Sequence, residues 1–123
     1  MKNDGGFEQM VGKRVDLYGV DSNVFCVAYR GTRRAFEAVE DESDGYRSML
    51  EELREVPLKG HVFPRQPVAR VEVSKAEGSF DGFVFTEAKT GHVWLRVGTD
   101  NADDYYPCFM VEWAPPGAAS TAT

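Results

Sequence analysis

The chain has 123 residues, 42% of them hydrophobic and 28% charged, and its formal net charge is −6. This length fits one domain with a core of its own, and no run of about 18 apolar residues predicts a transmembrane helix. The negative charge argues against nucleic-acid binding, because the phosphate backbone would be repelled. The first residues lack the apolar stretch of a secretory signal, so we expect a soluble, cytoplasmic protein with no membrane association.

Composition divides the chain into a flexible N-terminus over residues 1–10, a single β-rich domain over residues 11–113 and a disordered C-terminal tail over residues 114–123. The N-terminus contains Lys, Asn, Asp and Gly, and the tail is rich in Pro, Ala, Ser and Thr, so neither offers much apolar surface to bury. Within the domain, residues 11–20 have the pattern of a strand. Residues 24–29 form an apolar run that is typical of a central strand.

Residues 35–39 can return along residues 24–29 as a hairpin. The connection between them carries Arg30 and Arg33, and Arg34 follows directly. Three basic side chains at a hairpin tip are more typical of a solvated turn than of a phosphate clamp, and we interpret them in that way.

Cys26 and Cys108 are the two cysteines of the chain, and each lies in an apolar run. Where no export signal is present, a reducing compartment keeps thiols unpaired. The sequence therefore predicts two buried free thiols rather than a disulfide.

Much of the negative charge is concentrated between residues 36 and 55, where eight acids accompany two arginines. An apolar stripe overlaps this run and consists of Tyr46, Met49, Leu50 and Leu53. Its i, i+3, i+4, i+7 spacing predicts one amphipathic helix. Asp41 would lie near the positive end of the helix dipole, and Asp44 could cap the first N–H groups. The acidic run is therefore either the solvated start of this helix or a surface for a basic protein partner.

The second half of the domain has the pattern of an antiparallel meander. Strands are predicted over residues 69–74, 80–86, 93–97 and 109–113, with a bulge at Asp81–Gly82. The connections are too short for parallel crossovers. The predicted fold class is therefore α+β: mainly an antiparallel twisted β-sheet or partly open barrel of six to seven strands, with one helix.

The segment from Gly98 to Pro107 concentrates polar side chains between two predicted strands. Its candidate binding residues are Asp100, Asn101, Asp103, Asp104 and Tyr105. Neighbouring carboxylates repel one another unless they are solvated, hydrogen-bonded or bridged by a cation. The spacing does not match an EF-hand loop, so we interpret the segment first as a turn that its own side chains lock. The alternative is a calcium or magnesium site on Asp100, Asp103 and Asp104.

The strand before this segment places Trp94 and Arg96 on the parity opposite to its apolar residues. One explanation is a second layer, such as the predicted helix, that covers this face. The other is an aromatic and cationic patch that binds a partner, since Trp and Arg are enriched in interface hot spots. The sequence is compatible with both explanations.

No catalytic signature is recognisable in the chain. His61 and His92 are the only histidines, and no nucleophile elbow, Walker loop or His-Glu-x-x-His motif occurs. The sequence therefore favours a non-catalytic binding or protein-interaction domain. It would use an acidic surface around Glu40 to Asp44 together with the Asp100–Tyr106 loop, which we call the Asp100 segment. The alternative is a divalent-cation binding protein, with a metal-dependent hydrolase as one form of it.

Two strings of the sequence are distinctive: Glu40–Ser48, with the pattern EDxxDGYRS, and Gly91–Pro107, with the pattern GHVWLxxGTDNxDDYYP. They resemble recurring signatures of small, uncharacterised bacterial and phage proteins. The resemblance covers residues 15–113 and implies a cytoplasmic accessory protein. It attaches no activity and no catalytic residue to the chain.

Overall fold

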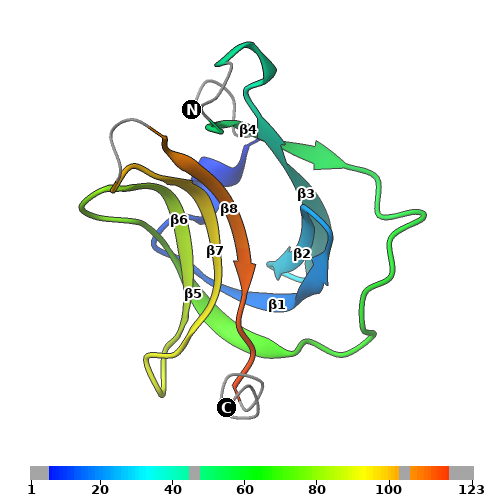
Figure 1. Cartoon of the computed structure of the whole chain (residues 1–123). Coiled ribbons are helices and arrows are strands. Elements are labelled where there is room, and N and C mark those ends of the chain that lie inside the picture. The colour runs from blue at the N-terminus through cyan, green and yellow to red at the C-terminus, as the bar shows by residue number, and fades with distance from the viewer. Residues whose placement is uncertain (1–5, 45–47, 103–105, 117–123) are drawn as a thin grey trace.

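The structure is a computed structural model that describes residues 6–44, 48–102 and 106–116. Its strands are β1 (Arg14–Asp21), β2 (Val24–Tyr29), β3 (Thr32–Glu40), β4 (Leu50–Val56), β5 (Ala69–Lys75), β6 (Phe80–Glu87), β7 (Val93–Asp100) and β8 (Cys108–Trp113). They form one open sheet in the order β4-β3-β2-β1-β5-β6-β7-β8 (Figure 1). Every neighbouring pair is antiparallel, so the predicted antiparallel sheet is confirmed.

The sheet consists of two four-stranded meanders, β1 to β4 and β5 to β8. Within each meander, every strand pairs with the next strand along the chain. β1 and β5 join the two halves, with Val15 opposite Val71 and Leu17 opposite Ala69. The sheet curls strongly, so that the two meanders face each other across the core (Figure 1).

The predicted α+β class with six to seven strands and one helix is wrong, because the described part of the chain is nearly all β and has eight strands. Its only helical elements are two short 3-10 turns, η1 (Phe7–Met10) and η2 (Glu42–Asp44). Leu50 and Leu53, which belong to the predicted helical stripe, are buried residues of β4 instead. Tyr46 of that stripe lies outside the described residues. None of the described helical elements is long and apolar enough to cross a membrane.

A β-bulge in β4 explains why this segment has helical spacing. Glu40 pairs with Leu50 and Val39 with Glu52, so Glu51 is an extra residue on β4. A bulge of this kind changes the spacing of the buried residues from two to three. Leu50 and Leu53 therefore both reach the core although the segment is extended.

Two further strands contain an extra residue. In β1 it is Tyr18, since Leu17 pairs with Val27 and Gly19 with Cys26. In β7 it is Trp94, since Leu95 pairs with Phe85 and Val93 with Thr86, which leaves Trp94 without a partner in β6. Because bulges increase the local twist and bend of a strand, these irregularities are consistent with the strong curl of the sheet.

The bulge predicted at Asp81–Gly82 is wrong, because these residues pair in regular register with Thr99 and Gly98. Gly82 and Gly98 face each other directly. A Cβ atom on Gly82 would lie 2.6 Å from the Gly98 Cα, and one on Gly98 would lie 2.7 Å from the Gly82 Cα. The backbones of β6 and β7 are thus too close for any side chain at this pair.

The core fills the concave side of the curled sheet. Its largest fully buried side chains are Phe7, Phe25, Phe36, Phe83, Phe85, Met10, Leu17, Leu53, Leu95, Val15, Val27 and Val71. They form one cluster that includes both meanders. Burying this apolar surface is the main favourable contribution to folding.

Phe7 and Met10 belong to the N-terminal segment that the sequence suggested to be flexible, but both are fully buried. The Phe7 ring makes edge-on contacts with Phe36 at 5.2 Å and with Phe83 at 4.8 Å between ring centroids. Phe36 lies in the first meander and Phe83 in the second. η1 therefore fills the space between the two halves of the sheet.

Candidate functional site

The two ends of the sheet meet at a seam, where the start of β4 approaches the β7–β8 connection. The Leu50 N–H donates a hydrogen bond of 2.6 Å to Thr99 Oγ1, and the Ser48 N–H donates one of 3.3 Å to the Pro107 carbonyl oxygen. Ser48 and Leu50 lie within the acidic run, and Thr99 and Pro107 flank the Asp100 segment. The acidic run is therefore in contact with both flanks of the Asp100 segment.

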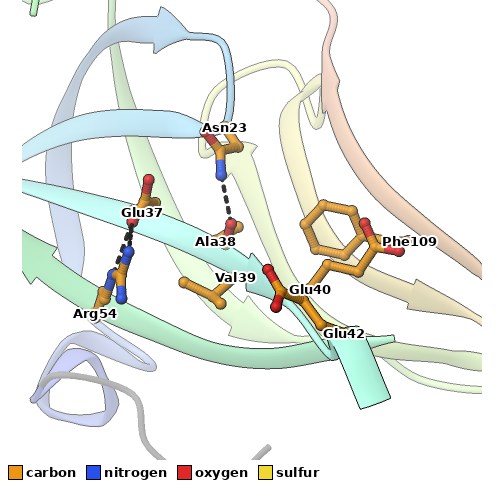
Figure 2. A pocket seen from close by; sticks show the side chains of 8 residues that line it. All are labelled: Asn23, Glu37, Ala38, Val39, Glu40, Glu42, Arg54 and Phe109. Atoms are coloured by element: carbon orange, nitrogen blue, oxygen red, sulfur yellow. Dashed lines mark hydrogen bonds and ion pairs between the residues drawn. The ribbon is translucent and has the colours of Figure 1, made fainter. Parts of the chain in front are cut away.

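A hollow of about 280 Å³ opens beside this seam (Figure 2). It is lined by Asn23, Glu37, Ala38, Val39, Glu40, Glu42, Arg54 and Phe109. We call it the acidic hollow, because three of its lining residues are glutamates and one is an arginine. Its walls come from both ends of the sheet, since Phe109 belongs to β8 and Arg54 to β4.

One side of the acidic hollow is fixed by hydrogen bonds between β3 and its neighbours. Arg54 donates from Nε to Glu37 Oε1 at 2.7 Å, and its Nη2 lies 2.6 Å from the same oxygen. Asn23 donates from Nδ2 to the Ala38 carbonyl oxygen at 2.7 Å and accepts from the Ala38 N–H at 2.9 Å through its own carbonyl. Figure 2 shows both contacts as dashed lines. These bonds hold the middle of β3 in place.

The other side carries the unbalanced charge. Glu40 ends β3, Glu42 begins η2, and both are exposed. Neither carboxylate makes an ion pair within the described residues, whereas Glu37 is neutralised by Arg54. The half-buried Phe109 ring adds an apolar wall. A surface with anionic and aromatic groups side by side suits a cationic side chain with an apolar stem.

Asp41 and Asp44, the predicted site residues of the acidic run, lie at η2. Asp41 Oδ1 accepts hydrogen bonds from the Ser43 N–H at 3.0 Å and from Ser43 Oγ at 2.7 Å. The Asp41 N–H donates to the Met49 carbonyl oxygen at 2.8 Å. Asp41 thus shapes the turn that positions Glu42. The backbone of Asp44 ends η2.

The Asp100 segment begins as a locked turn. Asp100 Oδ1 accepts a hydrogen bond of 3.0 Å from the Ala102 N–H and one of 3.5 Å from Ser79 Oγ. The Asn101 N–H donates to the Ser79 carbonyl oxygen at 2.8 Å. This geometry favours the turn interpretation for Asp100 and Asn101.

Three other predicted residues of that segment, Asp103, Asp104 and Tyr105, lie outside the described residues. Of the expected ligands for calcium or magnesium, only Asp100 can therefore be placed. In the part of the chain that the structure describes, no three His, Cys, Asp or Glu side chains are grouped so that they could hold a metal ion.

Trp94 and Arg96 are held by contacts within the protein. Trp94 is only 8% exposed, and its Nε1–H donates to Glu87 Oε2 at 2.9 Å. Arg96 lies with its guanidinium carbon 4.3 Å from the centroid of the Phe80 ring and pairs with Glu112 at 3.5 Å. The position of Trp94 in a bulge, rather than a covering helix, explains how this residue reaches the core.

Sequence reasoning missed Arg54 and Phe109 as lining residues of the acidic hollow. The only signal for Arg54 was its position in the acidic run, where it was assigned to a helix. Phe109 carried no signal, because its place beside β3 depends on the curl of the whole sheet. Glu40 and Glu42 lay inside the predicted acidic surface.

The chain matches no protein-family model, no curated protein and no solved structure. The resemblance of its two strings to small bacterial and phage proteins therefore stays a prediction.

Proposed function

We propose that the chain is a non-catalytic interaction domain whose acidic hollow receives a basic, extended segment of a protein partner. The observation that carries this proposal is the meeting of the two polar segments at the seam, beside a hollow in which Glu40 and Glu42 have no ion pair among the described residues. Negative charge beside an aromatic wall favours Lys or Arg side chains over neutral ones.

The position of the hollow supports an extended partner segment. β4 and β8 are the terminal strands of the sheet, so each has one backbone edge that no strand of the sheet covers. Such edges bind extended peptides by strand addition, with main-chain hydrogen bonds giving affinity and side-chain pockets giving specificity. The hollow would provide such a pocket next to these edges.

We also propose a cytoplasmic location. Both cysteines are free thiols. Cys26 is buried, whereas Cys108 is exposed at the start of β8, so the prediction of two buried thiols is wrong for Cys108. An exposed thiol persists where the surroundings are reducing. Fractionation of cells that produce the protein from its own gene would check this location.

The binding proposal can be tested with a short capped peptide of alternating arginine and valine residues, titrated calorimetrically. We expect saturable binding that weakens as the salt concentration rises, because exposed charge pairs are screened. The double variant Glu40→Lys, Glu42→Lys should weaken binding by more than about tenfold, since like charges placed together cost several kcal/mol.

The matched control is Glu72→Lys, Glu77→Lys, which makes the same change of net charge at exposed positions of β5 and the β5–β6 turn. It should leave the affinity nearly unchanged. Equal losses in both double variants would mean that the peptide responds only to net charge, and the proposed site would then be wrong.

A further inference from the structure

A second, separate site lies on the convex side of the sheet, beneath the long connection between β4 and β5. This connection covers residues 57–68, and we call it the strap. It runs past the outer ends of β2 and β1 before it enters β5 (Figure 1). This connection is about twice as long as the usual one of about 4–6 residues, and long connections often carry function.

The strap is anchored at several points. The Val68 N–H donates to the Leu17 carbonyl oxygen at 2.7 Å. Pro64 packs over Gly19, where an added Cβ would come within 3.3 Å of the proline ring, and Gly19 has a φ of +140°. Phe63 packs on a small outer cluster that consists of Tyr18, Cys26 and Ala28. These contacts fix the strap against the outer face of β1 and β2.

A pocket of about 200 Å³ lies under this cover, and its lining residues are Arg33, Leu58, His61 and Phe63. Its chemistry is opposite to that of the acidic hollow. One wall is cationic, through the Arg33 guanidinium, and the strap contributes the apolar Leu58 and Phe63. None of the residues that line the pocket is an acid.

Arg33 is poorly satisfied by the protein. Its guanidinium carbon lies 4.0 Å from the centroid of the Tyr18 ring, and Nη2 donates a long hydrogen bond of 3.4 Å to the Pro64 carbonyl oxygen. Its Nε is buried and has no hydrogen-bond partner among the described residues, and no ion pair of Arg33 occurs there either. A buried donor without an acceptor is costly, and native structures normally provide one.

The groups around Arg33 reinforce this interpretation. His61, a lining residue, is in contact with the carboxylate of Asp21, whose Oδ2 lies 3.3 Å from His61 Nδ1. Cys26 interacts with Arg33 through a side-chain hydrogen bond, but a thiol is only a weak acceptor and carries no charge while it is protonated. The cationic charge of Arg33 is thus left without an anionic partner within the described chain.

We propose that the pocket under the strap binds a small organic carboxylate, with its anionic group on the Arg33 guanidinium and its apolar body between Leu58 and Phe63. Arginine presents a planar fork of N–H donors that matches a carboxylate, and charge-assisted bonds of this kind are the strong ones. The Tyr18 ring fixes the plane of the guanidinium in advance, so less conformational entropy is lost on binding. The pocket volume limits the ligand to a compact molecule.

The test uses the whole chain labelled with ¹⁵N, with benzoate as the probe and the Arg33 Nε–H resonance as the readout. We expect this resonance to shift and saturate with benzoate. Benzamide, which has the same shape without the charge, should bind about tenfold more weakly or worse. Inorganic phosphate, which lacks the apolar body, should also bind more weakly than benzoate.

Two variants make the test specific. Arg33→Gln should weaken benzoate binding by roughly tenfold to a hundredfold, because a charge-assisted bond is lost. Arg70→Gln makes the same charge change at an exposed residue that is bonded to Asp16, and it should leave binding unchanged. If Arg33→Gln does not fold, Leu58→Ala replaces it, and a several-fold loss of affinity is expected from the missing apolar contact.

Several outcomes would overturn the proposal. An Arg33 Nε–H resonance that does not move at tens of millimolar benzoate would do so directly, without any variant. Equal responses to benzoate and benzamide would remove the role of the charge, and phosphate binding more tightly than benzoate would remove the role of the apolar body. None of these outcomes bears on the acidic hollow, which lies on a different part of the molecule.

Discussion

Leu50 and Thr99 are joined by a buried hydrogen bond across the seam between the two ends of the open sheet, although they are 49 positions apart in the chain. Thr99 is 1% exposed, and its hydroxyl oxygen accepts the Leu50 N–H at 2.6 Å. This bond lies next to the acidic hollow and brings the acidic run close to the Asp100 segment. Its loss should therefore affect both stability and the seam.

Thr99→Val keeps the shape of the side chain but removes the acceptor of a buried N–H. We expect the free energy of unfolding to fall by about 1–3 kcal/mol, the usual cost of leaving such a donor unsatisfied. Thr99→Ser retains the oxygen and should lose less. Urea denaturation of the three proteins checks this, and equal midpoints for the Val and Ser variants would contradict the role of the hydroxyl.

Gly82 and Gly98 leave no room for a side chain between β6 and β7. Gly82→Ala should lower the free energy of unfolding by more than about 2 kcal/mol, because its methyl group would overlap the Val97 carbonyl oxygen and the Gly98 backbone. Gly78→Ala is the control, since this glycine has a φ of +76° but open space around it. It should lose only about 1–2 kcal/mol from the unfavourable φ. Thermal denaturation can rank the two variants, and a milder effect at Gly82 would be evidence against the close approach.

Phe7→Ala tests whether η1 is part of the core. The ring is fully buried between the two meanders, so its removal should cost about 3–5 kcal/mol. Glu8→Ala, at the exposed neighbouring position, should change the stability by less than about 1 kcal/mol. Chemical denaturation measures both. A stability loss below 1 kcal/mol for Phe7→Ala would mean that the N-terminal segment contributes little to the fold.

The two thiols should differ in reactivity. Burial raises the pKa of the Cys26 thiol, and the hydrogen bond and charge of Arg33 offset only part of this effect. Since the thiolate is the reactive form, a thiol reagent at pH 8 should modify the exposed Cys108 and spare Cys26 in the folded protein. Mass spectrometry after a short reaction identifies the modified residue, and rapid modification of Cys26 would contradict its burial.

The raised pKa of Cys26 also predicts alkaline destabilisation. The folded state holds this proton more tightly than the unfolded state, so the contribution to stability is complete below the ordinary cysteine pKa of about 8.5. It declines as the pH rises through that value, because the unfolded thiol ionises first. The urea midpoint of Cys26→Ala should fall less between pH 7 and pH 10 than that of Cys108→Ser. Identical pH profiles would rule out a contribution from Cys26.

Most strands could be predicted because their buried and exposed residues alternate. The alternating buried residues Val71 and Val73 correctly predicted β5, and Leu95 and Val97 correctly predicted β7. The predicted helix failed because the bulge at Glu51 places Leu50 and Leu53 three positions apart, which a pattern with a period of 3.6 also allows. A bulge is a property of the strand pair, so one strand alone does not reveal it.

The candidate site was predictable only in part, for the same reason. The acidic run around Glu40 and Glu42 is a local feature of the sequence. Phe109 reaches the acidic hollow through the curl of the sheet, and Arg33 becomes a pocket residue only because the strap covers it. Because Arg33 lies close to Arg30 and Arg34 in the sequence, all three arginines were predicted to form a solvated turn. In the structure, the Arg33 guanidinium lies over the Tyr18 ring.

The arrangement of the chain as two consecutive meanders has a consequence for the order of folding. Within each meander, the hydrogen-bonded strands are close in sequence, so their hairpins close short loops and can form quickly. The pairing of β1 with β5 must close a much longer loop, since it joins Val15 to Val71. The topology therefore favours a late step in which two preformed meanders dock through the β1–β5 pairing. We expect the contacts of Phe7 and the Leu50–Thr99 hydrogen bond, which also link the two meanders, to form in this step.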